Sequence, residues 1–237
     1  AIGIAGVAAT MMAASAMAGI QGSKHDLTST SALNNNQQAN GTDEICVFCH
    51  TPHGTNTAIA VPLWNRLSDA TPATTYTTYD DLGTATLDGT VLTVGSVSLA
   101  CLSCHDGTQA MDSVINASGS GQWDPATGID MGGTWSGPRV TAGGVLDGAA
   151  TNVAYIGTDL RNDHPVGIQY AGGGVSVNNV EPTTSDFGDP DFKLVQHQTI
   201  NGNNQWWVDV AGAVDGTRTR RDIILYTRVD TAGLNVD

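Results

Sequence analysis

The hydrophobic and polar positions along the chain predict short extended segments joined by long irregular connections. Runs of β-branched and alternating residues favour strands at four places, 90–94, 174–180, 205–210 and 222–229. The last two are separated by a connection around 214–217 and predict a hairpin. Polar or glycine-rich stretches at 22–43 and 119–148 are typical of irregular connections. We therefore expect a mostly irregular, loop-rich fold with short helices and a few β-hairpins.

The first 22 residues form a separate apolar segment. They carry no charge, are rich in alanine, glycine and methionine, and contain Ala16-Met17-Ala18 near their end. An apolar run that ends in Ala-x-Ala is typical of a secretory signal, here with cleavage after Ala18, although the basic start of such a signal is missing. The alternative is a retained apolar helix that packs against protein. Both interpretations leave a single domain at 23–237, in a protein that is secreted to the cell exterior or, alternatively, to the periplasm.

The composition narrows the class of partner. The chain has 237 residues, 29 of them glycine, with 5% aromatic residues and a formal net charge of −14. This balance argues against a nucleic-acid partner, because binding nucleic acid requires clustered lysine and arginine. It suits a solubilised surface, or one that meets basic partner proteins. A chain of this composition buries few large apolar side chains of its own.

Two pentapeptides carry the strongest chemical signal. They are Cys46-Val47-Phe48-Cys49-His50 and Cys101-Leu102-Ser103-Cys104-His105, and they contain all four cysteines. In Cys-x-x-Cys-His the two thiols add to the vinyl groups of haem, and the adjacent imidazole binds the iron. The pattern predicts two covalent haems c, held by thioethers at Cys46, Cys49, Cys101 and Cys104, with His50 and His105 as proximal ligands. We expect short helices at both motifs and porphyrins that supply much of the apolar core.

Other interpretations of the same cysteines are weaker. Two Cys-x-x-Cys pairs can form a four-cysteine zinc knuckle, and Cys46, Cys49, His50 and His53 can crowd one metal ion. Zinc, however, does not require a histidine directly after the second cysteine in both copies. A thioredoxin-like dithiol has less support, because no βαβ pattern surrounds either motif.

Each haem iron needs a sixth ligand unless its site is open, and this ligand sets the redox potential. The candidates are four histidines and two methionines: His25, His53, His164, His197, Met111 and Met131. His53 follows His50 by three residues on a short helix, so we expect it to reach a neighbouring haem rather than its own. His25 lies on an arm that can fold back or reach another subunit. His197 has polar neighbours and is the weakest candidate.

Several islands of the sequence resemble the extracellular multihaem c-type cytochromes of metal-reducing and related microbes, some of which polymerise into conductive filaments. The islands are His25-Asp26-Leu27, Cys46 to His53, Pro62-Leu63-Trp64-Asn65, Cys101 to Thr108, His164-Pro165-Val166-Gly167 and Leu225-Tyr226-Thr227-Arg228. The resemblance implies His53 and His164 as distal ligands, and in a filament it implies that His25 ligates a haem of the adjacent subunit. Similar proteins usually continue into two or more further haem motifs, which implies either a two-haem member or a longer chain.

These observations predict an electron-transfer protein rather than an enzyme. Two histidines on each iron leave no open position for a small-molecule substrate, so the protein would pass electrons to redox partner proteins or extracellular acceptors. We expect a homo-polymer whose stacked haems conduct. The alternatives are a dihaem redox enzyme of the peroxidase kind, which needs an open haem, and a structural surface filament whose haems serve only as core.

Overall fold

The structure of the protein is a computed structural model that describes residues 19–31, 38–39, 42–59, 61–67, 75–83, 89, 91–119, 122–124, 126–149, 151–163, 165–173, 183–200, 203–210, 215–230 and 233–236. Most of the predicted apolar segment (residues 1–18), the predicted strand at 174–180 and His164 lie outside these ranges. Among the described residues, no helix has both the length and the apolar character needed to cross a membrane.

Within these ranges the fold is mostly irregular, with one short α-helix, several 3-10 turns and small antiparallel sheets, as the sequence predicts. The helix is α1 (Ser96–His105). The 3-10 turns are η1 (Ile45–Phe48), η2 (Tyr79–Leu82), η3 (Leu160–Asn162), η4 (Tyr170–Gly172) and η5 (Thr184–Asp186). The strands are β1 (Gln38–Ala39), β2 (Ser113–Val114), β3 (Ile129–Asp130), β4 (Thr134–Trp135), β5 (Val195–Ile200), β6 (Asn203–Val208), β7 (Ile223–Leu225), β8 (Thr227–Asp230) and β9 (Gly233–Val236).

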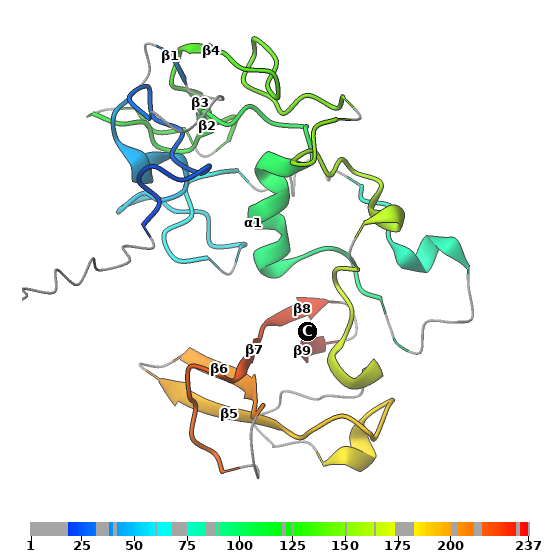
Figure 1. Ribbon diagram of the computed structural model, residues 1–237. Helices are drawn as coiled ribbons and strands as arrows, with labels where there is room; N and C mark the ends of the chain where they lie inside the picture. Colours follow the sequence, from blue (N-terminus) through cyan, green and yellow to red (C-terminus); the bar gives the residue numbers. More distant parts are fainter. Residues whose placement is uncertain are drawn as a thin grey trace, which may run out of the picture.

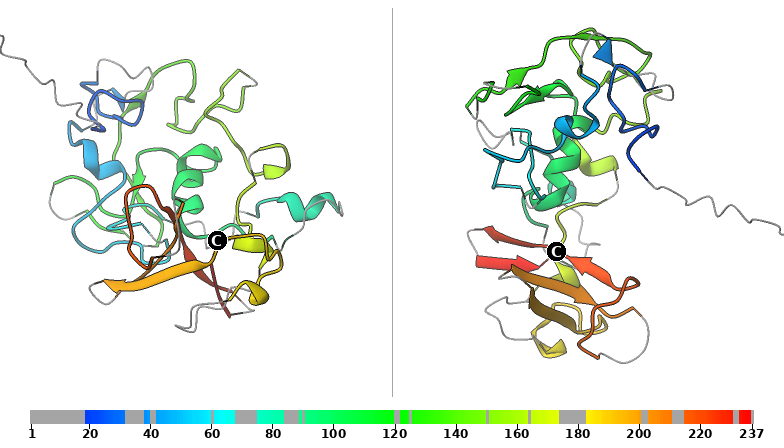
Figure 2. Two further views of the ribbon diagram at one scale, coloured as in Figure 1. Left: turned by 60° about the horizontal axis from the view of Figure 1, so that its bottom comes forward. Right: turned by 90° about the vertical axis from the view of Figure 1, so that its left-hand side faces the viewer.

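The elements gather on two sides of α1. Strands β1 to β4 lie with their loops on one side, and β5 to β9 lie on the other (Figure 1); the right-hand view in Figure 2 shows the same division. β1 pairs with β4, β2 with β3 and β8 with β9, while β5, β6 and β7 form a three-stranded sheet. One part of the protein thus contains both Cys-x-x-Cys-His motifs. The other part, built on β5 to β9 and called the sheet-containing part below, contains neither.

The part with the two motifs has its own apolar cluster. Its buried members come from distant segments of the chain: Leu27, Val47, Phe48, Met111, Trp135, Val140 and Leu146. Phe48 is 1% exposed, and its ring meets that of Trp135 edge to face, with centroids 6.5 Å apart. Cys49 and Cys104 pack against this cluster. One core therefore supports both motifs.

The sheet-containing part has a second cluster, built mainly on β5, β6 and β7. It contains Ala171, Phe187, Val195, Trp206, Val208 and Leu225. In the antiparallel register Trp206 lies opposite His197 on one side and Leu225 on the other. The predicted hairpin of 205–210 with 222–229 is confirmed for β6 and β7, whereas β8 pairs with β9 instead.

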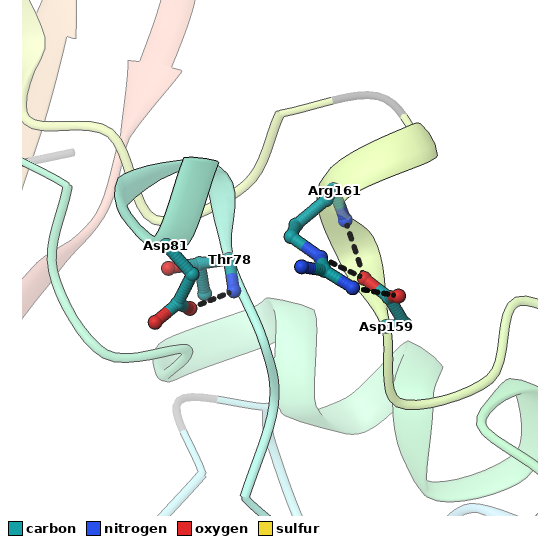
Figure 3. Close-up of polar contacts among 4 residues, drawn as sticks. All are labelled: Thr78, Asp81, Asp159 and Arg161. Carbon is teal, nitrogen blue, oxygen red and sulfur yellow. Dashed lines mark hydrogen bonds and ion pairs between the residues drawn. The ribbon is translucent and has the colours of Figure 1, made fainter. Parts of the chain in front are cut away.

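The segment that leads to residue 164 is anchored on the start of η2. The Leu160 backbone N–H donates to the Thr77 carbonyl (2.8 Å), and the Tyr79 hydroxyl donates to the Asp163 carbonyl (2.9 Å). Figure 3 shows four side chains that stabilise the ends of η2 and η3: Thr78, Asp81, Asp159 and Arg161. Arg161 donates to both carboxylate oxygens of Asp159, at 2.7 and 2.6 Å. The backbone before residue 164 is thereby held in one place.

The prediction of a strand at 90–94 is wrong for 91–94, the part of this run that the structure describes. Val91 forms one isolated bridge with Ile168, and the Leu92 N–H donates to the Gly167 carbonyl at 2.8 Å. The β-branched run favours an extended conformation, but a strand needs a continuous partner. The chain then enters α1 at Ser96.

Candidate functional site

The first motif lies at the end of η1. Its two middle residues, Val47 and Phe48, are buried in the apolar cluster, so the flanking residues face outward. Cys46 is exposed and Cys49 is half-buried. The N–H groups of Cys49 and His50 both donate to the Cys46 carbonyl, at 3.1 and 2.8 Å. This turn presents both thiols and the imidazole of His50 at the edge of the core.

The second motif forms the last turn of α1 and repeats this arrangement. Leu102 and Ser103 are buried, Cys101 is exposed, and Cys104 is half-buried. His105 is the last residue of the helix. The expectation of short helices at both motifs is confirmed, although one is a 3-10 turn and the other an α-helix. In both cases a pair of unlinked thiols lies beside a histidine.

Both motif histidines use one ring nitrogen in the same way. His50 Nδ1 lies 2.7 Å from the Pro62 carbonyl oxygen, and His105 Nδ1 lies 2.6 Å from the Ala154 carbonyl oxygen. A carbonyl oxygen can only accept, so Nδ1 carries the proton in each ring. This tautomer leaves the lone pair on Nε2, which is the form in which imidazole binds a metal ion. The two rings are therefore oriented and ready to coordinate through Nε2.

The backbone at Leu63 is strained where it serves His50. Leu63 has a positive φ of 57°, which is uncommon for a residue with a branched side chain. Its carbonyl accepts from the Thr51 N–H at 2.9 Å, and the carbonyl of the preceding Pro62 accepts from His50. The left-handed conformation of Leu63 thus places two consecutive carbonyl groups where they accept hydrogen bonds from His50 and Thr51. Such backbone strain is often found at functional sites.

His25 lies beside His105 of the same chain. Their ring centroids are 6.2 Å apart and the ring planes are inclined by 65°. With metal–nitrogen bonds of about 2 Å, two imidazoles on opposite sides of one metal ion have centroids roughly 6 Å apart. The separation is compatible with two ligands of one metal ion, and it is also that of the edge-to-face contact between His50 and Trp64, at 6.3 Å.

The same local turn follows each of these two histidines. The sequences are His25-Asp26-Leu27-Thr28 and His105-Asp106-Gly107-Thr108. In the first, Asp26 Oδ1 accepts from the Thr28 N–H (3.3 Å) and hydroxyl (2.6 Å). In the second, Asp106 Oδ1 accepts from the Thr108 N–H and hydroxyl, both at 2.9 Å. The His-Asp-x-Thr repeat is thus a signal in the sequence that the Cys-x-x-Cys-His pattern alone does not reveal.

The third position of the repeat differs for a steric reason. Leu27 is buried in the apolar cluster, whereas Gly107 lies under the ring of Tyr155. Gly107 has a φ of +73°, and a Cβ atom there would collide with that ring. Tyr155 also neighbours Ala154, whose carbonyl accepts from His105. Glycine at this position therefore lets an aromatic ring close over the turn that carries His105.

The carboxyl of Asp26 anchors the turn that presents His25. Burial alone would raise the pKa of Asp26, but hydrogen bonds from the Gly22 N–H and from Thr28 outweigh it and hold the pKa below its ordinary value. A lowered pKa in the folded state stabilises the protein above the unfolded pKa of about 3.9, and this stabilisation is lost as the pH falls through the folded value. His25 is therefore held by an anchored turn at neutral pH.

Replacing Asp26 with asparagine should destabilise this turn at pH 7. We expect the variant to lose about 1–3 kcal/mol, because buried donors lose a charged acceptor. The difference from the parent protein should shrink below about pH 4, where Asp26 of the unfolded chain becomes protonated, and should vanish as the pH falls through the lower pKa of the folded protein. Thermal unfolding of both proteins between pH 3 and pH 7 measures this. The control is Asp43→Asn, an exposed carboxyl that accepts from Ser29 at 2.9 Å. Equal losses in the two variants would contradict the prediction.

The two motifs lie close together. Burial, with a smaller contribution from the nearby Cys104 thiol, raises the pKa of the Cys49 thiol to about 11 against the opposing positive charge of Arg66. The segment that ends at Arg66 joins the motifs directly. The Asn65 N–H donates to the Cys49 carbonyl at 2.9 Å, and Arg66 donates to the carbonyl of Ser103 at 2.8 Å. One short segment of the chain therefore holds the two motifs near each other.

The remaining sequence candidates have separate places. His53 is exposed, and the helix that we expected to contain His50 and His53 ends before both, at Phe48. His197 stacks on Trp206 with centroids 4.7 Å apart, in the sheet-containing part. Met111 is buried in the apolar cluster and Met131 packs against it. Among the distal candidates that the structure describes, His25 is the histidine whose ring contacts that of a motif histidine, His105.

The donor set does not suit zinc in the described part of the chain. There, no three side chains of histidine, cysteine, aspartate or glutamate converge on a point that could hold a metal ion. A zinc knuckle would need four such donors at one point. The paired thiols and single Nε2 of each motif fit a haem attached along one edge of its ring.

Comparison of the chain with models of known protein families, with curated proteins and with solved structures gave no match in any of the three.

Proposed function

We propose that the protein is a c-type electron carrier with two covalent haems. Cys46, Cys49 and His50 would hold one haem, and Cys101, Cys104 and His105 the other, with His25 as second axial ligand at the latter. Bound haem would supply a metal centre that takes up and releases one electron. The observation that carries the proposal is that the Nδ1 atoms of both motif histidines contact backbone carbonyls, which leaves each Nε2 for iron.

The chain's own residues would perform three tasks in this function. Pro62 and Ala154 orient the proximal imidazoles through their carbonyls. The common apolar cluster excludes water from one side of both motifs. His25 would occupy the sixth coordination position of the iron that His105 binds, so that no position at this iron is left for a substrate. These features support electron transfer over peroxidase chemistry.

The sixth ligand at the first motif remains a prediction, with His53 and His164 as the leading candidates. Secretion, the extracellular acceptor and polymer formation are also predictions. The approach of His25 to His105 within one chain favours ligation inside the subunit over donation of His25 to a neighbour.

The proposal is tested by expressing the chain in cells that attach haem to Cys-x-x-Cys-His motifs. We expect the mass of the intact protein to include two haems, and the pyridine haemochrome spectrum to be that of haem c. A matched variant with Cys46 and Cys49 changed to alanine should retain one haem. A colourless chain with four alkylatable thiols would refute the proposal.

A further inference from the structure

Arg66 is fully buried between the two motifs and makes four hydrogen bonds. Its exposed fraction is 0%. Nε donates to the Ser103 hydroxyl at 3.2 Å, and Nη2 donates to the Ser103 carbonyl at 2.8 Å. Nη1 donates to the Met111 carbonyl and Nη2 also to the Ala110 carbonyl, at 2.8 and 2.9 Å. All four acceptors are neutral, so the guanidinium is held in place without a carboxylate among these partners.

The residue before Arg66 holds the first motif. Asn65 is also fully buried, and its Nδ2 donates to the Val47 carbonyl at 2.6 Å. Its Nδ2 and Oδ1 also bind the backbone of Asn116, both at 2.9 Å. Two consecutive side chains therefore donate hydrogen bonds to middle residues of the two Cys-x-x-Cys-His motifs, to Val47 in the first and to Ser103 in the second.

A buried charge without a counter-charge is costly to fold. Arginine keeps its positive charge in proteins, so this cost cannot be relieved by loss of a proton. In the described part of the chain the ion pair that forms is that of Arg161 with Asp159, not one of Arg66. The four hydrogen bonds offset part of this cost, but they leave a fixed positive charge in the interior between the two motifs. We therefore ask what that charge does at the two sites.

We propose that Arg66 sets the reduction potential of the two haem sites as well as their relative position, an inference that rests on the proposed function. Adding one electron to a haem iron lowers its charge by one unit. A fixed positive charge in a low-dielectric interior stabilises that reduced form and raises the potential. Arg66 hydrogen-bonds to the second motif, and its charge also acts on Cys49 of the first motif, so we expect it to raise the potential at both sites.

The test is a redox titration of Arg66→Gln followed by visible spectroscopy. Glutamine keeps donors for part of the network but removes the charge. We expect the equilibrium constant for reduction to fall at both sites, and by at least tenfold at one of them, which is 59 mV for a one-electron couple. Arg66→Lys, which retains the charge, should stay close to the parent protein.

Arg161→Gln is the matched control, because it removes the same charge from an exposed position. Solvent and salt screen an exposed charge, so its potentials should equal those of the parent. If Arg66→Gln carries two haems with a parental low-spin spectrum and unchanged potentials, Arg66 is structural and the inference is overturned. The same conclusion follows if Arg161→Gln shifts the potentials as much.

A second pair of variants decides the matter if Arg66→Gln does not fold. Ser103→Asp places a carboxylate beside the guanidinium of Arg66 and neutralises its charge, while the hydrogen bonds of Arg66 to the backbone carbonyls remain. Ser103→Asn is the uncharged control of the same shape. We expect lower potentials in Ser103→Asp alone, and equal potentials in the two loaded variants would overturn the inference. A parent chain that never takes up haem, as its mass would reveal, would instead refute the proposed function, and this inference with it.

Discussion

Replacing His25 with alanine is expected to leave two covalent haems on the chain and to open one of them at its sixth position. The rings of His25 and His105 lie 6.2 Å apart, a separation that suits two ligands of one metal. Loss of one imidazole should convert that haem from low spin to high spin at pH 7. The visible spectrum and electron paramagnetic resonance would report the change, and the reduced variant should bind about one additional carbon monoxide per chain compared with the parent protein.

His197→Ala is the control for this experiment. His197 stacks on Trp206 in the sheet-containing part, so its removal should leave the haem spectrum unchanged. If His25→Ala stays fully low-spin, His25 is not an axial ligand and its approach to His105 is ordinary ring packing. The state of association of the parent protein adds a second comparison. A low-spin spectrum in the monomer supports ligation within one chain, whereas one that appears only on association favours donation across subunits.

The short helices at the two motifs were predictable from the sequence because they are local. Five consecutive residues fix the relation between two thiols and an imidazole, and the structure adds the two carbonyls that orient the rings. The local turns that follow His25 and His105 were predictable as well. Both residues begin a His-Asp-x-Thr turn, whose hydrogen bonds span only three residues. What no local pattern indicates is that the two turns face each other.

The features that the sequence did not predict depend on contacts between distant residues. The burial of Arg66 cannot be inferred from its neighbours, since its acceptors lie 37 to 45 residues further along the chain. β5 contains Gln196, His197 and Gln198 and has little hydrophobic pattern of its own. It is a strand because β6 pairs with it along its whole length. Conversely, 90–94 has a strand-like composition, but its described part, 91–94, forms one isolated bridge and no strand, so pairing outweighs intrinsic preference here.

Trp206→Ala is expected to have the largest effect on stability. Trp206 is 2% exposed, belongs to the second apolar cluster and stacks on His197 across the sheet. Truncating a buried tryptophan removes its apolar contacts and leaves a cavity, which costs about 3–5 kcal/mol. Urea unfolding followed by far-ultraviolet circular dichroism should show this loss. The number of covalent haems should not change, because the thiols of the two motifs lie outside this cluster.

Trp123→Ala is the matched control, because the ring of Trp123 is 58% exposed on the part that carries the motifs. Its removal deletes little buried surface and should cost less than about 1 kcal/mol, in the range usual for surface substitutions. Equal losses in the two variants would mean that the β5–β7 sheet does not contribute a core of its own. A loss of haem in Trp206→Ala would mean that the sheet is needed for attachment. The predicted pattern, a large loss of stability at constant haem content, requires that the sheet and the motifs rest on separate clusters.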